Sequence, residues 1–376
     1  MRILIDASPL LLRSAGVKNY LYHWLEALRA EAGAGHSIRA FPFVNSPGPL
    51  EHERSVLPRP ATWLRLGLLY GVNVPGSPLL DWMAAGAGVV HLTNQVRRMV
   101  RRAAVTATVH DMTAAMLPEL HTAANVRADA FFAERVLRRA AGLIAVSENT
   151  RADAVRMLRL DERRIEVIYP GVAAGFSRAR RAGAETLARR YGIERPYALF
   201  VGTIEPRKNV DLLLDAWAQL GAATREEFEL VLIGPAGWAS EKTVARLARP
   251  ARGVRYLGYV PERDLPALTA AASVFVYPSL YEGFGFPVAQ AMAAGVPVIT
   301  SNVSSLPEVT GDAALLVDPR SAGELRDALV RLLGSAPLRE RLAAAGRERA
   351  ARYCWQECAR RSLRFFERVH GGGALR

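Results

Sequence analysis

Residues 201–209 read VGTIEPRKN, and they stand between an aliphatic run and a run with helical spacing. The residues just before them, 197–202, are almost all apolar and predict a short buried strand. A helical pattern that includes Leu213 and Trp217 follows. Ligands bind α/β sheets beyond the carboxyl ends of their strands. The segment therefore predicts an α/β fold with a ligand site at this strand-to-helix turn.

Short β-branched or aliphatic runs alternate with helical patterns along the whole chain, which predicts parallel sheets with crossover helices. The first series of expected strands is 2–6, 38–44, 89–92, 105–110, 143–146 and 165–168. The second series is 197–202, 228–233, 254–257, 274–277, 296–300 and 314–317. Because the pattern starts twice, we expect two doubly wound domains that face one another across a cleft.

The domain boundary is expected in residues 170–183, which are rich in Gly, Ala and Arg and end both patterns. A length of 376 residues fits two domains, which we place at 1–178 and 179–376. Tyr20, Trp24 and Leu28 predict a helix after the first strand. A last helix is expected over 355–369, after the second domain.

Arg207 and Lys208 are the most informative charged residues. The chain has only three lysines, so a lysine here is not explained by its general preference for arginine. Two cations at a helix N-terminus oppose the helix dipole by ~0.3 to 1 kcal/mol each. A bound diphosphate would reverse that penalty, because helix amides, an ammonium and a guanidinium would all face it. The alternative is two solvated charges on a loop.

A second loop of the same kind is at residues 281–287, which read YEGFGFP. Gly283 and Gly285 allow the backbone to approach a ligand closely, and Pro287 suits a first helical turn. Glu282 stands just before these residues, where a carboxylate can bind sugar hydroxyls. A Gly-x-Gly loop alone could be only a tight turn, but the two loops together predict a site for a sugar diphosphate.

Five segments in order give the chain a family resemblance: VHD at 109–111, AVS at 145–147, YPGV at 169–172, GTIEPRKN at 202–209 and EGFGFP at 282–287. They resemble the retaining nucleotide-sugar glycosyltransferases of family 4. That family has the GT-B fold of two Rossmann-like domains. The resemblance is strongest to bacterial mannosyltransferases and rhamnosyltransferases of polysaccharide and O-antigen assembly.

The resemblance implies a role for each matching residue. Arg207 and Lys208 would neutralise the leaving diphosphate, Glu282 would hold the donor sugar, and His110 would contact that sugar near its reacting carbon. A lone histidine is more often structural, but a strand end within this motif favours function. Donor binding is further expected at Gly16, Gly202, Thr203, Phe284, Gly285, Phe286 and Gln290. The family usually has glutamate at the position of Gln290, where it reaches the ribose, so this departure puts nucleotide affinity or donor identity in doubt.

The expected reaction is metal-independent transfer of a sugar with retention, and retention is inherited from the resemblance alone. No Asp-x-Asp pair occurs in the sequence to hold a metal ion at the diphosphate. The negative charge of the leaving group must therefore be stabilised by Arg207, Lys208 and helix N-termini. The expected donor is an NDP-sugar, GDP-mannose first, and the acceptor is a glycan or a lipid-linked saccharide. Two alternatives stay open. One is a non-catalytic nucleotide-sugar-binding protein, and the other is a GT-B-fold epimerase of NDP-sugars.

The net charge of +13 is typical of proteins that bind nucleic acid or an anionic membrane. The two expected domains carry +7 and +6, so neither is a basic domain, and nothing else favours nucleic acid. Residues 54–110 hold seven arginines, one aspartate and large apolar residues such as Trp63 and Leu64. This mixture fits either a peripheral membrane surface or an ordinary loop and core. Two cysteines and no leader predict a cytoplasmic protein, attached at most to the inner face of the plasma membrane.

Overall fold

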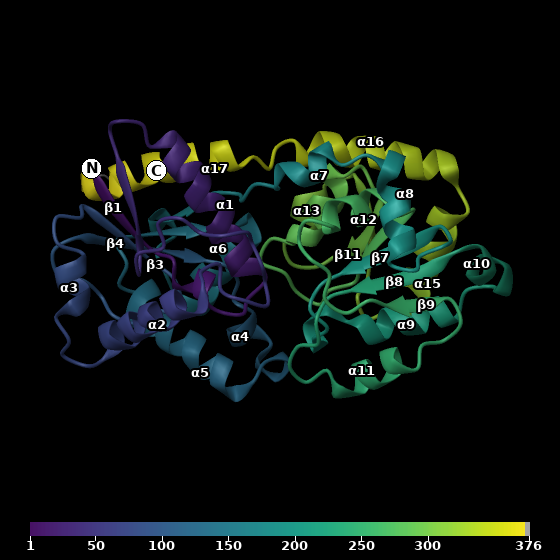
Figure 1. The fold of residues 1–376 in the computed structure, drawn as a ribbon, viewed down its shortest axis with the longest axis horizontal. Coiled ribbons are helices and arrows are strands. Elements are labelled where there is room, and N and C mark those ends of the chain that lie inside the picture. The colour runs from purple at the N-terminus through teal and green to yellow at the C-terminus, as the bar shows by residue number, and fades with distance from the viewer. Residues whose placement is uncertain (373–376) are drawn as a thin grey trace. The chain divides into compact units, whose positions relative to one another are not determined.

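The computed structural model describes residues 1–372, and these form two compact α/β units (Figure 1). The first unit consists of Met1–Gly171 and the segment from Cys354 onward. The second is Val172–Tyr353. Each unit is built on its own six-stranded sheet, and every strand pair in both sheets is parallel.

The sheet of the first unit has the strand order β2-β1-β3-β4-β5-β6. Its strands are β1 (Arg2–Asp6), β2 (Ser37–Phe41), β3 (Val89–Leu92), β4 (Ala104–Val109), β5 (Gly142–Ala145) and β6 (Ile165–Val167). The helices of this unit are α1 (Gly16–Glu31), α2 (Arg59–Asn73), α3 (Leu79–Met83), α4 (Thr113–Met116), α5 (Ala123–Phe132), α6 (Glu148–Leu158) and α17 (Trp355–His370).

The sheet of the second unit has the strand order β12-β11-β10-β7-β8-β9. Its strands are β7 (Tyr197–Val201), β8 (Glu229–Ile233), β9 (Val254–Tyr256), β10 (Val274–Tyr277), β11 (Val298–Ser301) and β12 (Ala314–Val317). Its helices are α7 (Ala174–Arg178), α8 (Arg181–Arg190), α9 (Val210–Ala218), α10 (Ala222–Glu227), α11 (Glu241–Ala248), α12 (Leu265–Ala271), α13 (Phe286–Ala293), α14 (Leu306–Thr310), α15 (Ala322–Leu333) and α16 (Ala336–Ala350).

All twelve expected strands are confirmed, with ends that shift by three residues at most. They were recognisable because strands buried on both faces of a parallel sheet are continuous apolar runs. The central strands β3, β5, β8 and β10 are buried along their whole length. The helix expected after the first strand is α1, and Tyr20, Trp24 and Leu28 on it are fully buried.

The domain assignment differs from the expected one at both places where the chain passes between units. The boundary lies between Gly171 and Val172, inside the expected linker, but residues after it form α7 and the start of α8 rather than an irregular segment. Both helices pack on α12 of the second unit. The expected linker is therefore largely helical and belongs to the second unit.

The terminal helix α17 belongs to the first unit, not to the second as expected. Figure 1 shows it beside α1, and it also contacts β3 and β4. The Nε1 group of Trp24 donates a hydrogen bond of 3.0 Å to the Ser362 hydroxyl, joining α1 to α17. Gly171 lies against the start of this helix, and a Cβ added to it would be 2.3 Å from the nitrogen of Trp355. A side chain at 171 would therefore displace the helix start.

None of the helices within residues 1–372 combines the length and hydropathy that a membrane span requires.

Candidate active site

The strand order of the second unit creates a site at the ends of two neighbouring strands. β7 pairs with β8 on one side and with β10 on the other, so the connections that follow β7 and β10 diverge there. Such a switch point leaves a crevice at the carboxyl ends of the two strands. Arg207 and Lys208 follow β7, and Glu282 follows β10. The topology thus brings Glu282 beside two residues that precede it by more than 70 positions in the sequence.

The loop after β7 is held in place by the loop after β10. Arg207 and Lys208 lie in a short 3-10 turn, Pro206–Lys208, one residue before α9, so they precede the helix rather than begin it. Asn209 adopts a left-handed backbone with φ of 58°. Its side-chain amide donates to the carbonyls of Pro278 at 3.1 Å and Pro319 at 2.7 Å. These bonds fix the direction in which the two cations project.

Arg207 and Lys208 form ion pairs with Glu282. The Nη1 atom of Arg207 lies 2.9 Å from Oε2 of Glu282, and the Nζ atom of Lys208 lies 2.5 Å from its Oε1. A second acid, Glu205, lies 2.8 Å from Nη2 of Arg207. All four side chains are nearly buried, so the cations are not solvated charges on an open loop. The anions that balance them in this structure are the two glutamates.

The pKa values in this cluster follow from burial and from the neighbouring charges. Burial alone would raise the pKa of Glu282, but Arg207 and Lys208 outweigh it and lower the pKa to about 2. The pKa of Lys208 is also lowered, because burial and the charge of Arg207 outweigh the attraction of the glutamates. A simple ion pair would raise the pKa of its lysine, whereas burial, together with the charge of Arg207, lowers that of Lys208. A further anion would stabilise its charged form.

Three residues that sequence reasoning missed complete the cluster. The Ser279 hydroxyl donates to Oε1 of Glu282 at 2.7 Å, and Tyr277 lies below Nζ of Lys208, 5.2 Å from its ring centre. Glu205 is the third. An acid two residues before Arg207, inside the segment 201–209, is a sequence signal that could have marked Glu205. No sequence signal marks Ser279 or Tyr277, because their roles depend on the pairing of β7 with β10.

The loop at 281–287 leads directly into α13, as expected. Gly285 precedes the helix with φ of 93°, a backbone conformation that residues other than glycine rarely adopt. A Cβ at this position would also lie 2.8 Å from the side chain of Leu306. Phe284 is buried and packs edge-on against Tyr353, with ring centres 5.1 Å apart. Phe286 and Gln290 are one helical turn apart and both are half-buried, so they share a partly accessible face of α13.

Gly202 and Thr203 begin the loop after β7 and lie close to the loop after β8. The amide of Gly202 donates to the Ile233 carbonyl at 2.9 Å. Gly234 comes so close that a Cβ on it would be 1.9 Å from the Gly202 oxygen. This packing fixes the backbone of Gly202 and Thr203 beside the switch point.

The other expected site residues, His110 and Gly16, lie in the first unit. His110 follows β4, and its Nε2 atom is shielded from solvent without a hydrogen-bond partner among residues 1–372. The Tyr20 ring meets it edge-on at 5.0 Å. Burial lowers the pKa of His110 to about 4, against the opposite effect of Asp111, so the imidazole is neutral at pH 7. Gly16 is exposed at the first turn of α1, with open space where a Cβ would be.

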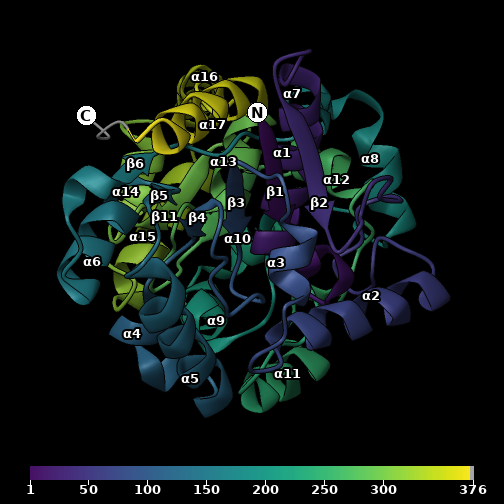
Figure 2. The ribbon, with the colours of Figure 1, turned by 90° about the vertical axis from the view of Figure 1, so that its left-hand side faces the viewer.

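The arginine-rich stretch 54–110 presents large apolar side chains to solvent. Trp63, Leu64 and Tyr70 on α2 are 73%, 67% and 76% exposed, and Trp82 on α3 is 71% exposed. Figure 2 shows α2 and α3 outside the sheet of the first unit. Their surroundings contain the exposed arginines Arg54, Arg59, Arg97, Arg101 and Arg102. Leu69 is buried, so α2 has one face on the core and one apolar face on the surface.

Within residues 1–372, no three His, Cys, Asp or Glu side chains lie together in a way that could hold a metal ion.

Solved structures share this fold over almost the whole chain. A sucrose-phosphate synthase from Thermosynechococcus elongatus superposes with a TM-score of 0.74, covering 99% of both chains at 22% identity. HepE from Anabaena, in complex with UDP-glucose, superposes with a TM-score of 0.72, covering 97% of this chain and 100% of the other at 18% identity. Two six-stranded parallel sheets with helices around them define the GT-B glycosyltransferase fold.

Family models and curated relatives match both units. The model described as "Glycosyltransferase Family 4" matches residues 14–175, and the one described as "Glycosyl transferases group 1" matches 185–349. An O-antigen chain mannosyltransferase B of Escherichia coli is 38% identical over 265 residues, 69% of each chain. An MMP alpha-(1->4)-mannosyltransferase of Mycolicibacterium hassiacum is 31% identical over 241 residues, 63% of this chain and 56% of the relative. The chain belongs to the family 4 glycosyltransferases and is a glycosyltransferase.

Proposed function

We propose that the enzyme transfers a hexose from an NDP-sugar to a glycan or lipid-linked acceptor in bacterial surface polysaccharide synthesis, with retention and without a metal ion. The proposed sugar is mannose, with rhamnose second, and GDP-mannose is the proposed donor. The observation that carries the proposal is the buried cluster of Arg207, Lys208 and Glu282 at the switch point. Similarity to mannosyltransferases supports the choice of sugar.

The cluster suits a ligand that brings both a diphosphate and hydroxyl groups. Without the donor, two glutamates balance two cations. A diphosphate that reaches Arg207 and Lys208 competes with Glu282 for them, which frees its carboxylate to accept hydrogen bonds from sugar hydroxyls. Diphosphate and sugar binding are then coupled through a single residue. The positive charge is in place before the glycosidic bond breaks, which is how preorganised sites stabilise a leaving group.

The remaining site residues have supporting roles in this proposal. The backbones of Gly202, Thr203, Phe284 and Gly285 line the donor diphosphate and sugar. Gln290 bonds a ribose hydroxyl from α13, with Phe286 beside it on the same face. From the first unit, His110 contacts the donor sugar as a neutral imidazole, which can hydrogen-bond a hydroxyl without adding charge near an oxocarbenium-like carbon. Gly16 brings the start of α1 to the phosphate or the acceptor.

A thermal-shift panel tests the donor assignment. We expect GDP and GDP-mannose to raise the melting temperature more than UDP, TDP and ADP or their sugars, because binding to the native state stabilises it. Replacing Lys208 by Ala is expected to remove most of the shift. If none of these nucleotides changes the melting temperature of the wild-type enzyme, the donor assignment is wrong.

We further propose that the enzyme works in the cytoplasm, at the inner face of the plasma membrane, and attaches there through α2 and α3. A lipid-linked acceptor is presented at that surface. Exposed Trp63, Leu64 and Trp82 support shallow insertion at the level of the headgroups. Each nearby arginine adds ~1 kcal/mol of attraction to an anionic leaflet. The same reasoning makes anionic lipid, and not nucleic acid, the proposed partner of the basic charge.

A further inference from the structure

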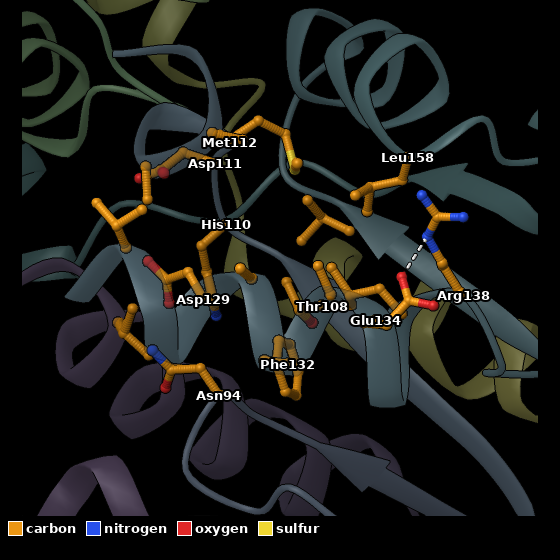
Figure 3. Close-up of a pocket in the computed structure, with 18 residues that line it drawn as sticks. Asn94, Thr108, His110, Asp111, Met112, Asp129, Phe132, Glu134, Arg138 and Leu158 are labelled. Carbon is orange, nitrogen blue, oxygen red and sulfur yellow. Dashed lines mark ion pairs between the residues drawn. The ribbon is translucent and has the colours of Figure 1, made fainter. Parts of the chain in front are cut away.

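The two side chains to which the proposed function gives a contact with the donor sugar are held in different ways. His110, in the first unit, lies at the wall of a cavity of about 370 Å³ (Figure 3). Its Nε2 atom is shielded from solvent and has no hydrogen-bond partner among residues 1–372. Glu282, in the second unit, has partners for its carboxylate, its amide and its carbonyl. Glu282 is therefore the more firmly held of the two.

Two consecutive serines of the loop after β11 hold the main chain of Glu282. The Glu282 amide donates a hydrogen bond of 3.0 Å to the Ser304 hydroxyl, and the Ser305 hydroxyl donates one of 3.0 Å to the Glu282 carbonyl. Because β11 pairs in parallel with β10, the loops that follow the two strands are neighbours at the same edge of the sheet. Ser305 is fully buried and Ser304 is half-buried. Both main-chain groups of Glu282 are thus bonded by side chains of the neighbouring loop.

Ser304 has a backbone conformation that residues with a Cβ seldom adopt. Its φ is 55°, in the left-handed region, where such a residue is strained. Strain of this kind persists only where the surrounding structure imposes it, and it occurs most often at functional sites. Glycine would remove the strain, but it has no hydroxyl to accept from the Glu282 amide. The contact with Glu282 therefore gives a reason for a serine at this position.

Ser305 is at the N-cap position of α14, but it does not cap this helix. A serine there usually accepts a hydrogen bond from an amide two or three residues further along. The Ser305 side chain makes no such bond, and its hydroxyl donates to the Glu282 carbonyl instead. The other end of α14 is fixed by Arg349 and Tyr353, which both donate to the Val309 carbonyl, at 3.2 Å and 2.8 Å. Ser305 therefore reaches Glu282 from an anchored helix.

We propose that Ser304 and Ser305 are positioning residues for sugar transfer, which hold the main chain of Glu282 while its carboxylate exchanges the two cations for hydroxyls of the donor sugar. The inference rests on the proposed function, in which the donor diphosphate competes with Glu282 for Arg207 and Lys208. Without the donor, these ion pairs also restrict Glu282. Once the donor weakens them, the bonds to the two serines remain. The serines therefore act mainly on the bound donor, where a small error in the position of the sugar slows the reaction.

Steady-state kinetics of Ser304→Gly, Ser305→Ala and the double variant test the proposal, with the NDP-sugar that gives the largest thermal shift as donor. Glycine adopts a φ of 55° without strain, so Ser304→Gly removes the hydroxyl and keeps the conformation of the loop. We expect kcat of the double variant to fall about tenfold or more, while KM for the donor stays within about threefold of wild type. Diphosphate binding is intact in these variants, and only the orientation of the sugar is lost.

The thermal shift with the NDP alone reports the diphosphate site separately. It should be the same in the double variant as in the wild type, because Arg207 and Lys208 are unchanged. Serines that served the fold alone would give a different result. Their loss would lower the melting temperature without a selective fall in kcat.

The matched control is Ser335→Gly. It removes another half-buried serine hydroxyl of the second unit, which accepts from the Leu338 amide at 3.4 Å at the start of α16. It should leave kcat and KM within about twofold of wild type. A fall in kcat of the double variant below about fivefold, an equal fall in Ser335→Gly, or a loss confined to KM would overturn the inference. If the wild type shows the nucleotide shift in those cases, only the role of the two serines is wrong. Absence of that shift in the wild type would refute the donor site and the inference together.

Discussion

Lys208 is a residue whose replacement should affect catalysis far more than folding. Replacing it by Ala removes one of two buried cations at the diphosphate site and leaves Glu282 paired with Arg207. We expect kcat/KM for the donor to fall at least ~100-fold, since preorganised charge in such sites is worth roughly 3 kcal/mol.

The control for Lys208 is Lys242→Ala, because Lys242 is an exposed lysine on α11 of the same unit. It should change kcat/KM less than twofold. Steady-state kinetics with a range of donor concentrations measure both variants. A loss below fivefold in Lys208→Ala, in a protein that folds normally, would mean that Lys208 does not bind the diphosphate.

Glu282 should contribute stability that depends on pH. Arg207 and Lys208 outweigh the effect of burial and lower its pKa from the ordinary value of 4.5 to about 2, so its ionised form stabilises the folded state. Glu282→Gln should lower the free energy of unfolding by about 3 kcal/mol at pH 7, because it leaves two buried cations without this partner. That difference should be constant above about pH 5 and shrink as the pH falls from 4.5 toward 2.

Urea unfolding of the wild type and Glu282→Gln at several pH values measures this difference. Glu241→Gln, a change to an exposed acid at the start of α11, is the control and should have little effect at any pH. A difference that stays the same from pH 7 to pH 3 would show that the carboxylate is not held ionised by the cluster.

The sequence allowed the chemistry of Arg207, Lys208 and Glu282 to be predicted, but not their mutual contacts. Cations at a strand-to-helix turn and an acid before a glycine loop are local signals. The ion pairs depend on β10 lying beside β7, which is a property of the strand order.

Among the helices, α17 contributes to the stability of the first unit. Leu363 on α17 is buried, and this helix packs on α1, β3 and β4. Leu363→Ala should destabilise the first unit by ~2 to 5 kcal/mol, as for other large-to-small changes in a core. Hydrogen exchange should rise in α1, β3 and β4 and stay unchanged in β7 to β12.

The matching change in the second unit is Leu342→Ala, which removes a buried leucine from α16. It should give the reverse pattern, with faster exchange around α13 and β11, which α16 contacts. Equal effects of Leu363→Ala on both sheets would contradict the assignment of α17 to the first unit.

Strands were predictable from sequence and the partners of helices were not. A parallel strand is buried on both faces, so its apolar run is visible locally. The amphipathic pattern of α17 shows that one face is buried but does not say against which unit it packs. The Gly, Ala and Arg content of 170–183 predicts a linker, although alanine also favours the helices α7 and α8 that form there.

At the scale of the whole molecule, the exposed apolar face of α2 and α3 predicts reversible membrane attachment. The enzyme should sediment with vesicles containing anionic lipid, and much less with neutral vesicles or at high salt. Changing Trp63 and Trp82 to Ser should weaken binding, because both side chains are about 70% exposed and available for insertion. Changing Arg97, Arg98, Arg101 and Arg102 to Gln should weaken it further.

The control for charge replaces four exposed arginines of the second unit by Gln: Arg249, Arg252, Arg320 and Arg331. This variant has the same net charge as the first arginine variant and should keep its vesicle binding. Equal recovery on neutral and anionic vesicles would remove the support for a lipid-linked acceptor. If both arginine variants lose vesicle binding equally, the binding depends on the total charge of the protein and not on this surface.

We propose that Arg207 and Lys208 support a retaining sugar transfer without a metal ion. The most direct measurement is the proton NMR spectrum of the product made by EDTA-treated enzyme from the NDP-sugar that gives the largest thermal shift. We expect an undiminished rate and a new glycosidic bond with the anomeric configuration of the donor. An inverted product, or no product until Mg²⁺ or Mn²⁺ is restored, would contradict it.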